Sequence, residues 1–237
     1  MNTSKNKSSV ASILLLVASS LSSFSQPVQI SPPGSISYGK SYNEWTVAWW
    51  QWAFSIPAAN NPVLDTTGQY AAVGQSGPVW FLGSTFGNSI KRAETIPSGK
   101  AIFLPVYQWI FGASAGDCDP SNPGVACDVP TLQASAAAAT TSVQEMEVDI
   151  DGHTVAQIRN YRAASPGSFS VTLPPDNVPQ LFGLPTPAGT YSPQVADGYW
   201  LMIAPLSAGK HLINVHVIPG QNYGSAFLLK YNITVTP

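Results

Sequence analysis

Most of the chain after residue 77 consists of short apolar runs separated by turn-forming residues, and this pattern constrains the fold most strongly. Each run is rich in β-branched or aromatic residues and is bounded by Gly, Pro, Asn or Asp, as strands are. The runs lie at 78–84, 100–109, 144–151, 154–162, 167–174, 198–206, 210–219 and 226–237. Short strands at this spacing predict an all-β fold, a sandwich or jelly roll.

Two of these runs indicate how the strands are buried. Residues 198–206, GYWLMIAPL, are apolar on both faces, which predicts a central strand covered on both sides. Residues 144–151 alternate strictly between apolar and polar side chains, which predicts a strand with one face in the core. Asp151 and Gly152 follow directly and predict a tight hairpin turn.

The segment from Ser41 to Pro57, SYNEWTVAWWQWAFSIP, has a clear helical period. Ser41 and Glu44 predict a capping box at its start, and Pro57 ends it. One apolar stripe of the helix would cover the second face of the central strand, and it consists of Tyr42, Trp45, Ala48, Trp49, Trp52, Ala53 and Ile56. Trp50 lies off this stripe, so either the helix is buried on two sides or Trp50 forms the wall of a groove.

Two further segments are predicted between and beside the strands. Residues 129–143 are Ala-rich and predict a short helix with Asp128 as its N-cap. Residues 58–77 form a long loop that contains several turn-forming residues. A loop of this length in a compact domain is usually functional or held in place by contacts.

Residues 1–25 have the organisation of a secretory signal peptide. Two lysines precede a short apolar run at 10–21, and small residues occupy the minus-three and minus-one positions before Gln26. Neither this run nor any later one is long enough to span a bilayer. We therefore expect an exported protein, secreted or periplasmic, with an extended lead-in at 26–40 and a single domain at 41–237.

Cys118 and Cys127 are the only cysteines of the chain. In an exported protein such a pair usually forms a disulfide, which here would close a turn-rich loop. The sequence has no Cys-x-x-Cys motif and no His beside either cysteine, which disfavours a metal or redox role.

Charged residues are sparse. The chain has 10 basic and 12 acidic residues, which together are 9% of its length, and no basic stripe that could neutralise phosphates. We therefore expect no nucleic-acid partner. The aromatic content of 11% in a nearly neutral chain instead suits a neutral ligand that stacks on flat rings.

No cofactor is expected, with one alternative. His211 and His216 are an odd number of residues apart on one predicted strand, so they face opposite sides and cannot share a transition metal.

The alternative is Ca²⁺ bound by an acidic row on the predicted strand at 144–151. The row consists of Glu145, Glu147, Asp149 and Asp151. Same-face neighbours on a strand lie about 6.6 Å apart, so one ion would use at most two carboxylates together with loop carbonyls. The other interpretation is a solvated sheet face.

Four segments of the sequence resemble those of an uncharacterised family of exported bacterial proteins. They are WWQWAFSIP, NPVLDTTG, GQSGPVWFLGSTFG and ADGYWLMIAPLSAGKH, and the likeness extends over most of the chain after the signal peptide. The resemblance implies relatedness and secretion. It implies no activity and no catalytic residues.

The aromatic residues provide the strongest functional hypothesis. Seven aromatic residues are too many for all of them to be assigned to the core. They are Trp50, Trp80, Trp109, Tyr107, Tyr191, Tyr199 and Trp200. We expect a binding site for a glycan or another neutral ligand, formed by Trp50, Asp65, Gln75, Asp197 and Tyr199.

Two alternatives stay open beside ligand binding. One is a polysaccharide-active hydrolase or lyase that uses Asp65 and Asp197, since such enzymes need two carboxylates in a cleft. Either aspartate could instead accept hydrogen bonds from its own turn. Gly-x-Ser-x-Gly and phosphate-loop motifs are absent. The other alternative is a structural, envelope-associated protein without a small-molecule site.

Overall fold

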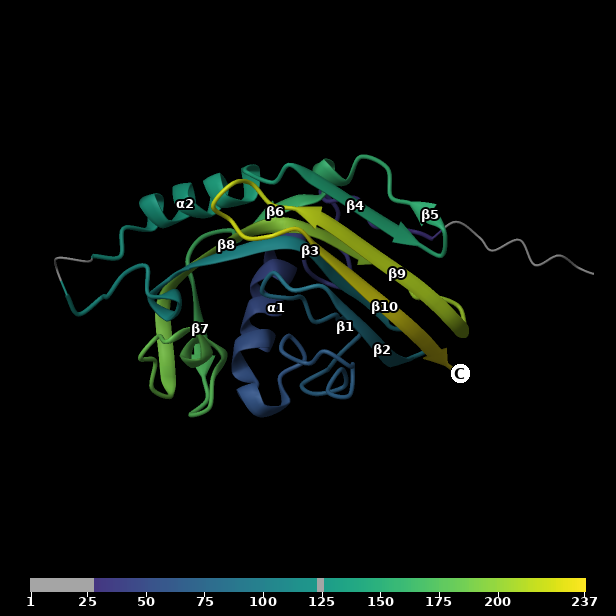
Figure 1. Cartoon of the computed structure of the whole chain (residues 1–237), viewed down its shortest axis with the longest axis horizontal. Coiled ribbons are helices and arrows are strands. Elements are labelled where there is room, and N and C mark those ends of the chain that lie inside the picture. The colour runs from purple at the N-terminus through teal and green to yellow at the C-terminus, as the bar shows by residue number, and fades with distance from the viewer. Residues whose placement is uncertain (1–27, 123–125) are drawn as a thin grey trace, which may run out of the picture.

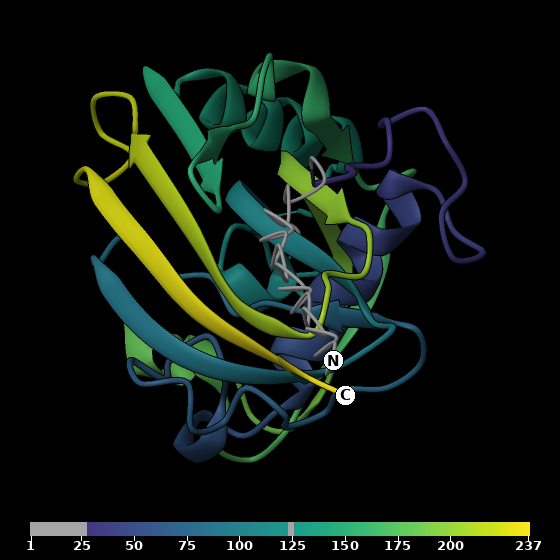
Figure 2. The same ribbon diagram turned by 90° about the vertical axis from the view of Figure 1, so that its right-hand side faces the viewer.

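The computed structural model describes residues 28–122 and 126–237, so the predicted signal peptide at 1–25 lies outside the described residues. The described chain is mostly β, with two five-stranded sheets and two α-helices (Figure 1). The first sheet contains β1 (Val79–Phe81), β3 (Ala101–Gly112), β8 (Gly189–Ile203), β6 (Arg162–Ala164) and β7 (Phe169–Leu173). The second contains β2 (Ile90–Pro97), β10 (Phe227–Thr236), β9 (Gly209–Ile218), β4 (Glu145–Ile150) and β5 (His153–Thr154), and Figure 2 shows β2, β10 and β9 side by side as one curved layer.

The helices include two α-helices and several short 3₁₀ helices. They are α1 (Tyr42–Ser55), α2 (Val129–Thr141), η1 (Ala58–Asn60), η2 (Ala113–Ala115), η4 (Ile158–Tyr161) and η5 (Val178–Phe182). None of the helices among the described residues is both long and apolar enough to cross a membrane.

Helix α1 begins and ends as predicted. The Ser41 hydroxyl accepts a hydrogen bond from the Glu44 main-chain N–H, and the Glu44 carboxylate accepts one from the Ser41 N–H at 2.8 Å. This is the predicted capping box. The helix ends at Ser55, before Pro57. Both its sides are buried, because Trp50 and Phe54 are covered as well as the predicted stripe, apart from Ala48, which is half-buried.

Strand β8 is the predicted central strand, and both of its faces are covered. It lies between β3 on one edge and β6 and β7 on the other. Trp200 and Met202 pack in one apolar cluster with α1, whereas Leu201 and Ile203 pack in another with the second sheet. Figure 1 shows α1 on one side of β8, with the second sheet and α2 on the other.

Helix α2 forms at the predicted position and is tied to the end of β3. The Asp128 carboxylate accepts a hydrogen bond from the Thr131 N–H, as expected of an N-cap. Leu132 packs near Val195 on the face of the first sheet that the second sheet also covers. The disulfide between the two cysteines is present and anchors the segment before α2 to the segment after β3.

The hairpin prediction is also confirmed. Strand β4 has alternately exposed and buried side chains along most of its length, and Asp151 and Gly152 join it to β5. Their φ angles are +54° and +82°, and a two-residue type I′ hairpin turn requires positive φ at both of its central residues.

Two strand assignments differ from the sequence prediction. Residues 154–162 do not form one strand, because most of the segment is turns and the helix η4. Its apolar residues Val155, Ile158 and Tyr161 are spaced by three, the period of a 3₁₀ helix. Strand β2 was not predicted, because Arg92 and Glu94 occupy two of its inward-facing positions.

Arg92 holds the long loop that follows α1. Its guanidinium is 1% exposed and donates hydrogen bonds to the carbonyl oxygens of Val63, Asp65, Gly83 and Ser84. The loop is therefore anchored to the residues that follow β1. A charged side chain is accepted in this interior because each of its polar groups has a partner.

Candidate functional site

A cavity with a volume of about 450 Å³ lies beside the second half of β3. We call it the edge cavity. Its walls come from α1, the loop after β1, β3, η2, η5 and the turn between β9 and β10. The lining is formed by Trp50, Phe54, Ser84, Thr85, Phe86, Gly87, Tyr107, Gln108, Trp109, Ile110, Ser114, Ala115, Val178, Pro179, Phe182, Leu184, Pro219, Asn222, Tyr223, Gly224, Ser225 and Phe227.

The position of the edge cavity follows from how β3 is paired. Strand β1 pairs only with Ala101 to Phe103, whereas β8 pairs with β3 almost to its end. The lining includes the consecutive residues 107–110 of β3. Successive side chains of a strand point to opposite faces. The cavity therefore extends across the unpaired edge of β3 rather than over one face of the sheet.

Helix α1 supplies one wall through two residues one turn apart, Trp50 and Phe54. Their ring centroids lie 5.3 Å apart in an edge-to-face arrangement. Trp50 is 4% exposed, and its indole N–H has no hydrogen-bond partner among the described residues. The neighbouring Trp49 differs, because its indole N–H donates to the Leu82 carbonyl at 2.9 Å.

Two exposed phenylalanines form the rim. Phe86 is 41% exposed and Phe182 is 55% exposed, and their ring centroids are 4.8 Å apart. Phe86 comes from the loop after β1 and Phe182 from η5, so the pair joins two segments across the cavity. Sequence analysis did not identify either residue. The available signal was an aromatic side chain next to Gly in a loop, at Phe86–Gly87 and Phe182–Gly183.

The chemistry of the lining is neutral and mostly apolar. No lining residue carries a formal charge. Burial raises the pKa of the Tyr107 hydroxyl, so this group stays protonated at neutral pH. The Ser114 hydroxyl donates to Gln194 and the Thr85 hydroxyl donates to the Asn88 carbonyl, so both already have partners. Such a lining suits an uncharged ligand with a large apolar surface.

Of the five predicted site residues, Trp50 alone lines the edge cavity. Asp65 lies in the loop after α1, where its carboxylate accepts hydrogen bonds from the main-chain N–H groups of Thr67 and Tyr70. These bonds contribute to holding the pKa of Asp65 below its usual value even though burial opposes them. The carboxylate thus has the turn-stabilising contacts that the sequence offered as its alternative role.

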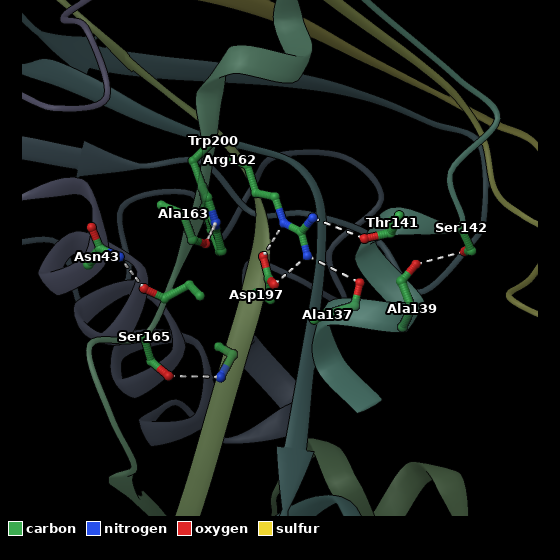
Figure 3. Close-up of polar contacts among 12 residues, drawn as sticks. Asn43, Ala137, Ala139, Thr141, Ser142, Arg162, Ala163, Ser165, Asp197 and Trp200 are labelled. Carbon is green, nitrogen blue, oxygen red and sulfur yellow. Dashed lines mark hydrogen bonds and ion pairs between the residues drawn. The ribbon is translucent and has the colours of Figure 1, made fainter. Parts of the chain in front are cut away.

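Asp197 forms an ion pair with Arg162 in which the two nearest atoms are 2.7 Å apart (Figure 3). The Arg162 guanidinium also donates to the Thr141 hydroxyl and the Ala137 carbonyl of α2. Figure 3 shows the guanidinium between the Asp197 carboxylate and α2. The pair connects the first sheet to α2 and is 7% exposed on the aspartate side chain.

Gln75 and Tyr199 also have structural contacts. The Gln75 amide donates to the Ala71 and Phe81 carbonyls and accepts from the Phe81 N–H, which fixes the end of the loop to β1. Tyr199 is buried in the core between the two sheets. The structure therefore does not bring the five residues together at the edge cavity.

The described residues contain no group of three or more His, Cys, Asp or Glu side chains able to hold a metal ion. Asp149 and Asp151, from the acidic row, have partners of their own. Asp149 accepts a hydrogen bond from the Gly152 N–H, and Asp151 contacts His211 at 2.6 Å. The His211 ring and Asp151 together link the hairpin turn to β9.

Comparison with known proteins gave little. No family model matches the chain, and no curated protein matches it. A chain from a solved structure described as "Structure of PbICP-C in complex with falcipain-2" matches with 11% sequence identity and a TM-score of 0.24. The match covers 67% of this chain and 99% of that chain. A likeness at this level supports no inference about fold or function.

Proposed function

We propose that the protein is an exported binding protein for a neutral ligand, a glycan or another uncharged molecule, held in the edge cavity. The observation that carries this proposal is the lining, which is rich in aromatic rings and has no charged residue. The volume of about 450 Å³ is in the range of small-molecule sites in proteins. The exposed rim pair Phe86 and Phe182 supplies flat surfaces for stacking.

Export is part of the proposal. The disulfide is of the kind that persists in oxidising compartments outside the cytosol. The composition of residues 1–25 agrees with this through the expected signal peptide. Release into the medium and retention in a periplasm are equally compatible with these features.

We further assign the two layers to a β-sandwich. Support comes from the apolar cluster between the two sheets, to which both contribute. The parallel pairs β1–β3 and β2–β10 depart from a jelly roll, whose strands are antiparallel.

The two alternatives have weaker support. A hydrolase or lyase would need Asp65 and Asp197 free in one cleft, but Asp65 is held by its own turn and Asp197 by Arg162. A structural protein without a ligand has no need of a cavity of this size lined by unpaired aromatic donors.

Titration of the disulfide-bonded protein with a panel of uncharged probes, neutral oligosaccharides and capped peptides among them, tests the proposal. The variants Phe182→Ala and Leu181→Ala make a matched pair, since both residues lie in η5 and are exposed but only Phe182 lines the cavity. We expect about a tenfold loss of affinity for Phe182→Ala, equivalent to about 1.4 kcal/mol, and no change for Leu181→Ala. Equal losses, or no binding of any probe, would contradict it.

A further inference from the structure

Among the described strands, none pairs with the second half of β3 on the edge opposite β8. From Val106 to Phe111, no described residue outside β8 forms a hydrogen bond with its main chain. In an antiparallel pair, successive residues direct their N–H and C=O groups alternately toward the partner strand and away from it. Alternate residues of this stretch therefore present main-chain donors and acceptors on the open side.

The edge cavity occupies this open side. One wall carries Trp50, Phe54 and Phe182, on the side of α1 and η5. The opposite wall carries Tyr223 and Phe227, on the side of the second sheet. The exposed edge of β3 lies between two aromatic walls, so a bound molecule would meet main-chain groups along one side and rings above and below.

We propose that the neutral ligand is an extended peptide segment with uncharged side chains, which adds to the edge of β3 as a further strand. This inference rests on the proposed function. Main-chain pairing supplies affinity in this mode of recognition, and pockets for alternate side chains supply specificity. Here successive side chains of the peptide would point alternately to one wall of the edge cavity and to the other.

The hydrogen-bonding groups of the site favour a peptide over a glycan. A sugar ring presents several hydroxyls, each of which needs a polar partner when buried. The polar side chains of the lining that have no hydrogen-bond partner among the described residues are scattered. They include the amides of Gln108 and Asn222 and the indole N–H groups of Trp50 and Trp109, whereas Ser114 and Thr85 are already engaged. A regular row of main-chain donors and acceptors instead matches another strand.

The geometry also sets a length. The residues from Tyr107 to Phe111 span roughly 17 Å at the rise of an antiparallel strand. The matching peptide has about five or six residues in an extended form. It contains no proline at the pairing positions, because proline has no N–H to donate.

The test uses a library of acetyl- and amide-capped hexapeptides made of uncharged residues, titrated against the disulfide-bonded protein. The best binder is then N-methylated at its odd or at its even positions. N-methylation removes the N–H groups on one edge of the extended peptide and leaves its side chains in place. We expect one set to lose at least tenfold in affinity and the other set to bind within about twofold of the parent.

Amide hydrogen exchange provides a second readout. We expect the peptide to slow exchange at alternate amides between Tyr107 and Phe111, and Phe182→Ala to require more peptide for the same protection than Leu181→Ala does. Equal binding by the two N-methylated sets would overturn strand addition. Binding of neutral oligosaccharides without binding of any peptide would overturn the peptide and leave the proposed function standing. Failure of every neutral probe would overturn both.

A second copy of the chain is a different occupant of the same edge. Sedimentation velocity without peptide would then show a dimer, with the alternate amides between Tyr107 and Phe111 already protected. That result would overturn the peptide proposal, whereas a monomer with rapidly exchanging edge amides supports it.

Discussion

The two halves of β3 have the same neighbour, β8, on one edge but different surroundings elsewhere. From Ala101 to Val106 the strand is fully buried between α1 and the second sheet, and the Phe103 ring stacks on Trp200 with centroids 5.2 Å apart. Beyond Tyr107 the side chains are mostly half-buried, and none of the described strands pairs with the edge opposite β8. We call these two parts the inner half and the outer half.

The two halves differ both in strand pairing and in cover, because β1 pairs only with the inner half. The inner half is covered by regular elements on both faces. The outer half lies beside the edge cavity, whose walls come from α1, from loops, from short 3₁₀ helices and from the turn between β9 and β10. We therefore expect substitutions in the inner half to change the free energy of unfolding, and those around the outer half to change binding.

The largest expected effect belongs to Phe103→Ala in the inner half. Removing this buried ring should lower the free energy of unfolding by about 3–5 kcal/mol, because a cavity remains where the ring was. Denaturant unfolding followed by circular dichroism measures it. Phe103→Leu is the matched control and should cost clearly less. A loss below about 1 kcal/mol for Phe103→Ala would contradict the difference between the two halves, because the inner half would then tolerate a cavity as the outer half does.

The next effect concerns Glu94, which lies in the core that the inner half packs against. Burial raises the pKa of Glu94 to about 7, although the Arg92 charge and the Trp80 side chain lower it in part. The folded protein then binds this proton more tightly than the unfolded chain does. Stability should therefore fall as the pH rises from 4.5 to about 7, by up to about 3 kcal/mol.

Glu94→Gln tests this dependence, because the amide does not titrate. Unfolding in denaturant at several pH values across the interval should give a flatter profile for the variant than for the parent chain. Parallel profiles would show that Glu94 titrates as it does in the unfolded chain, and that the core beside the inner half does not exclude water.

The third effect belongs to the disulfide, which closes the segment at the end of the outer half. Replacing Cys118 and Cys127 together by Ser should lower the free energy of unfolding by about 2–3 kcal/mol on the loop-entropy model. Thermal unfolding of the double variant beside the oxidised parent chain measures it, and the reduced parent chain is the control. A double variant as stable as the oxidised protein would mean that the loops of the outer half need no covalent closure.

The smallest effect is expected at the rim. The coupling between Phe86 and Phe182, measured in a double-mutant cycle with Ala, should be about 0.5 kcal/mol in stability, because both rings are largely exposed. Binding of the best uncharged probe should show a larger coupling than unfolding does. A coupling above about 2 kcal/mol in unfolding would place the rim with the stable inner half and remove the contrast.

Local signals in the sequence predicted the elements that form by local rules. The capping box at Ser41, the cap at Asp128 and the turn at Asp151 all appear as expected, because each depends on residues close together in the chain. The double cover of β8 was also predictable from its uninterrupted apolar run. Strand β2 was not, because buried Arg92 and Glu94 break the apolar alternation by which strands are recognised.

Of the residues that line the edge cavity, only Trp50 was predicted from the sequence as part of a site. Trp50 drew attention because it lies outside the apolar stripe of α1, and it does line the cavity. The other walls come from segments far apart in sequence, as Phe86 and Tyr223 illustrate. Asp65 and Gln75 were expected there because they occur in a long loop, yet their polar groups hold that loop to its own neighbours. No local pattern distinguishes a loop that binds a ligand from one that binds itself.

Arg92 brings together two stretches of the chain that are distant in sequence. One guanidinium holds carbonyls at Val63 and Asp65 and others at Gly83 and Ser84, so both ends of the intervening segment meet at a single side chain. The segment from Val63 to Ser84 is thus closed into a ring by hydrogen bonds, as the segment from Cys118 to Cys127 is closed by a disulfide. A protease cut inside this ring would leave both new ends attached to the domain. Losing the arginine would remove the four carbonyl contacts at once, while the hydrogen bonds of Gln75 with Ala71 and Phe81 would remain.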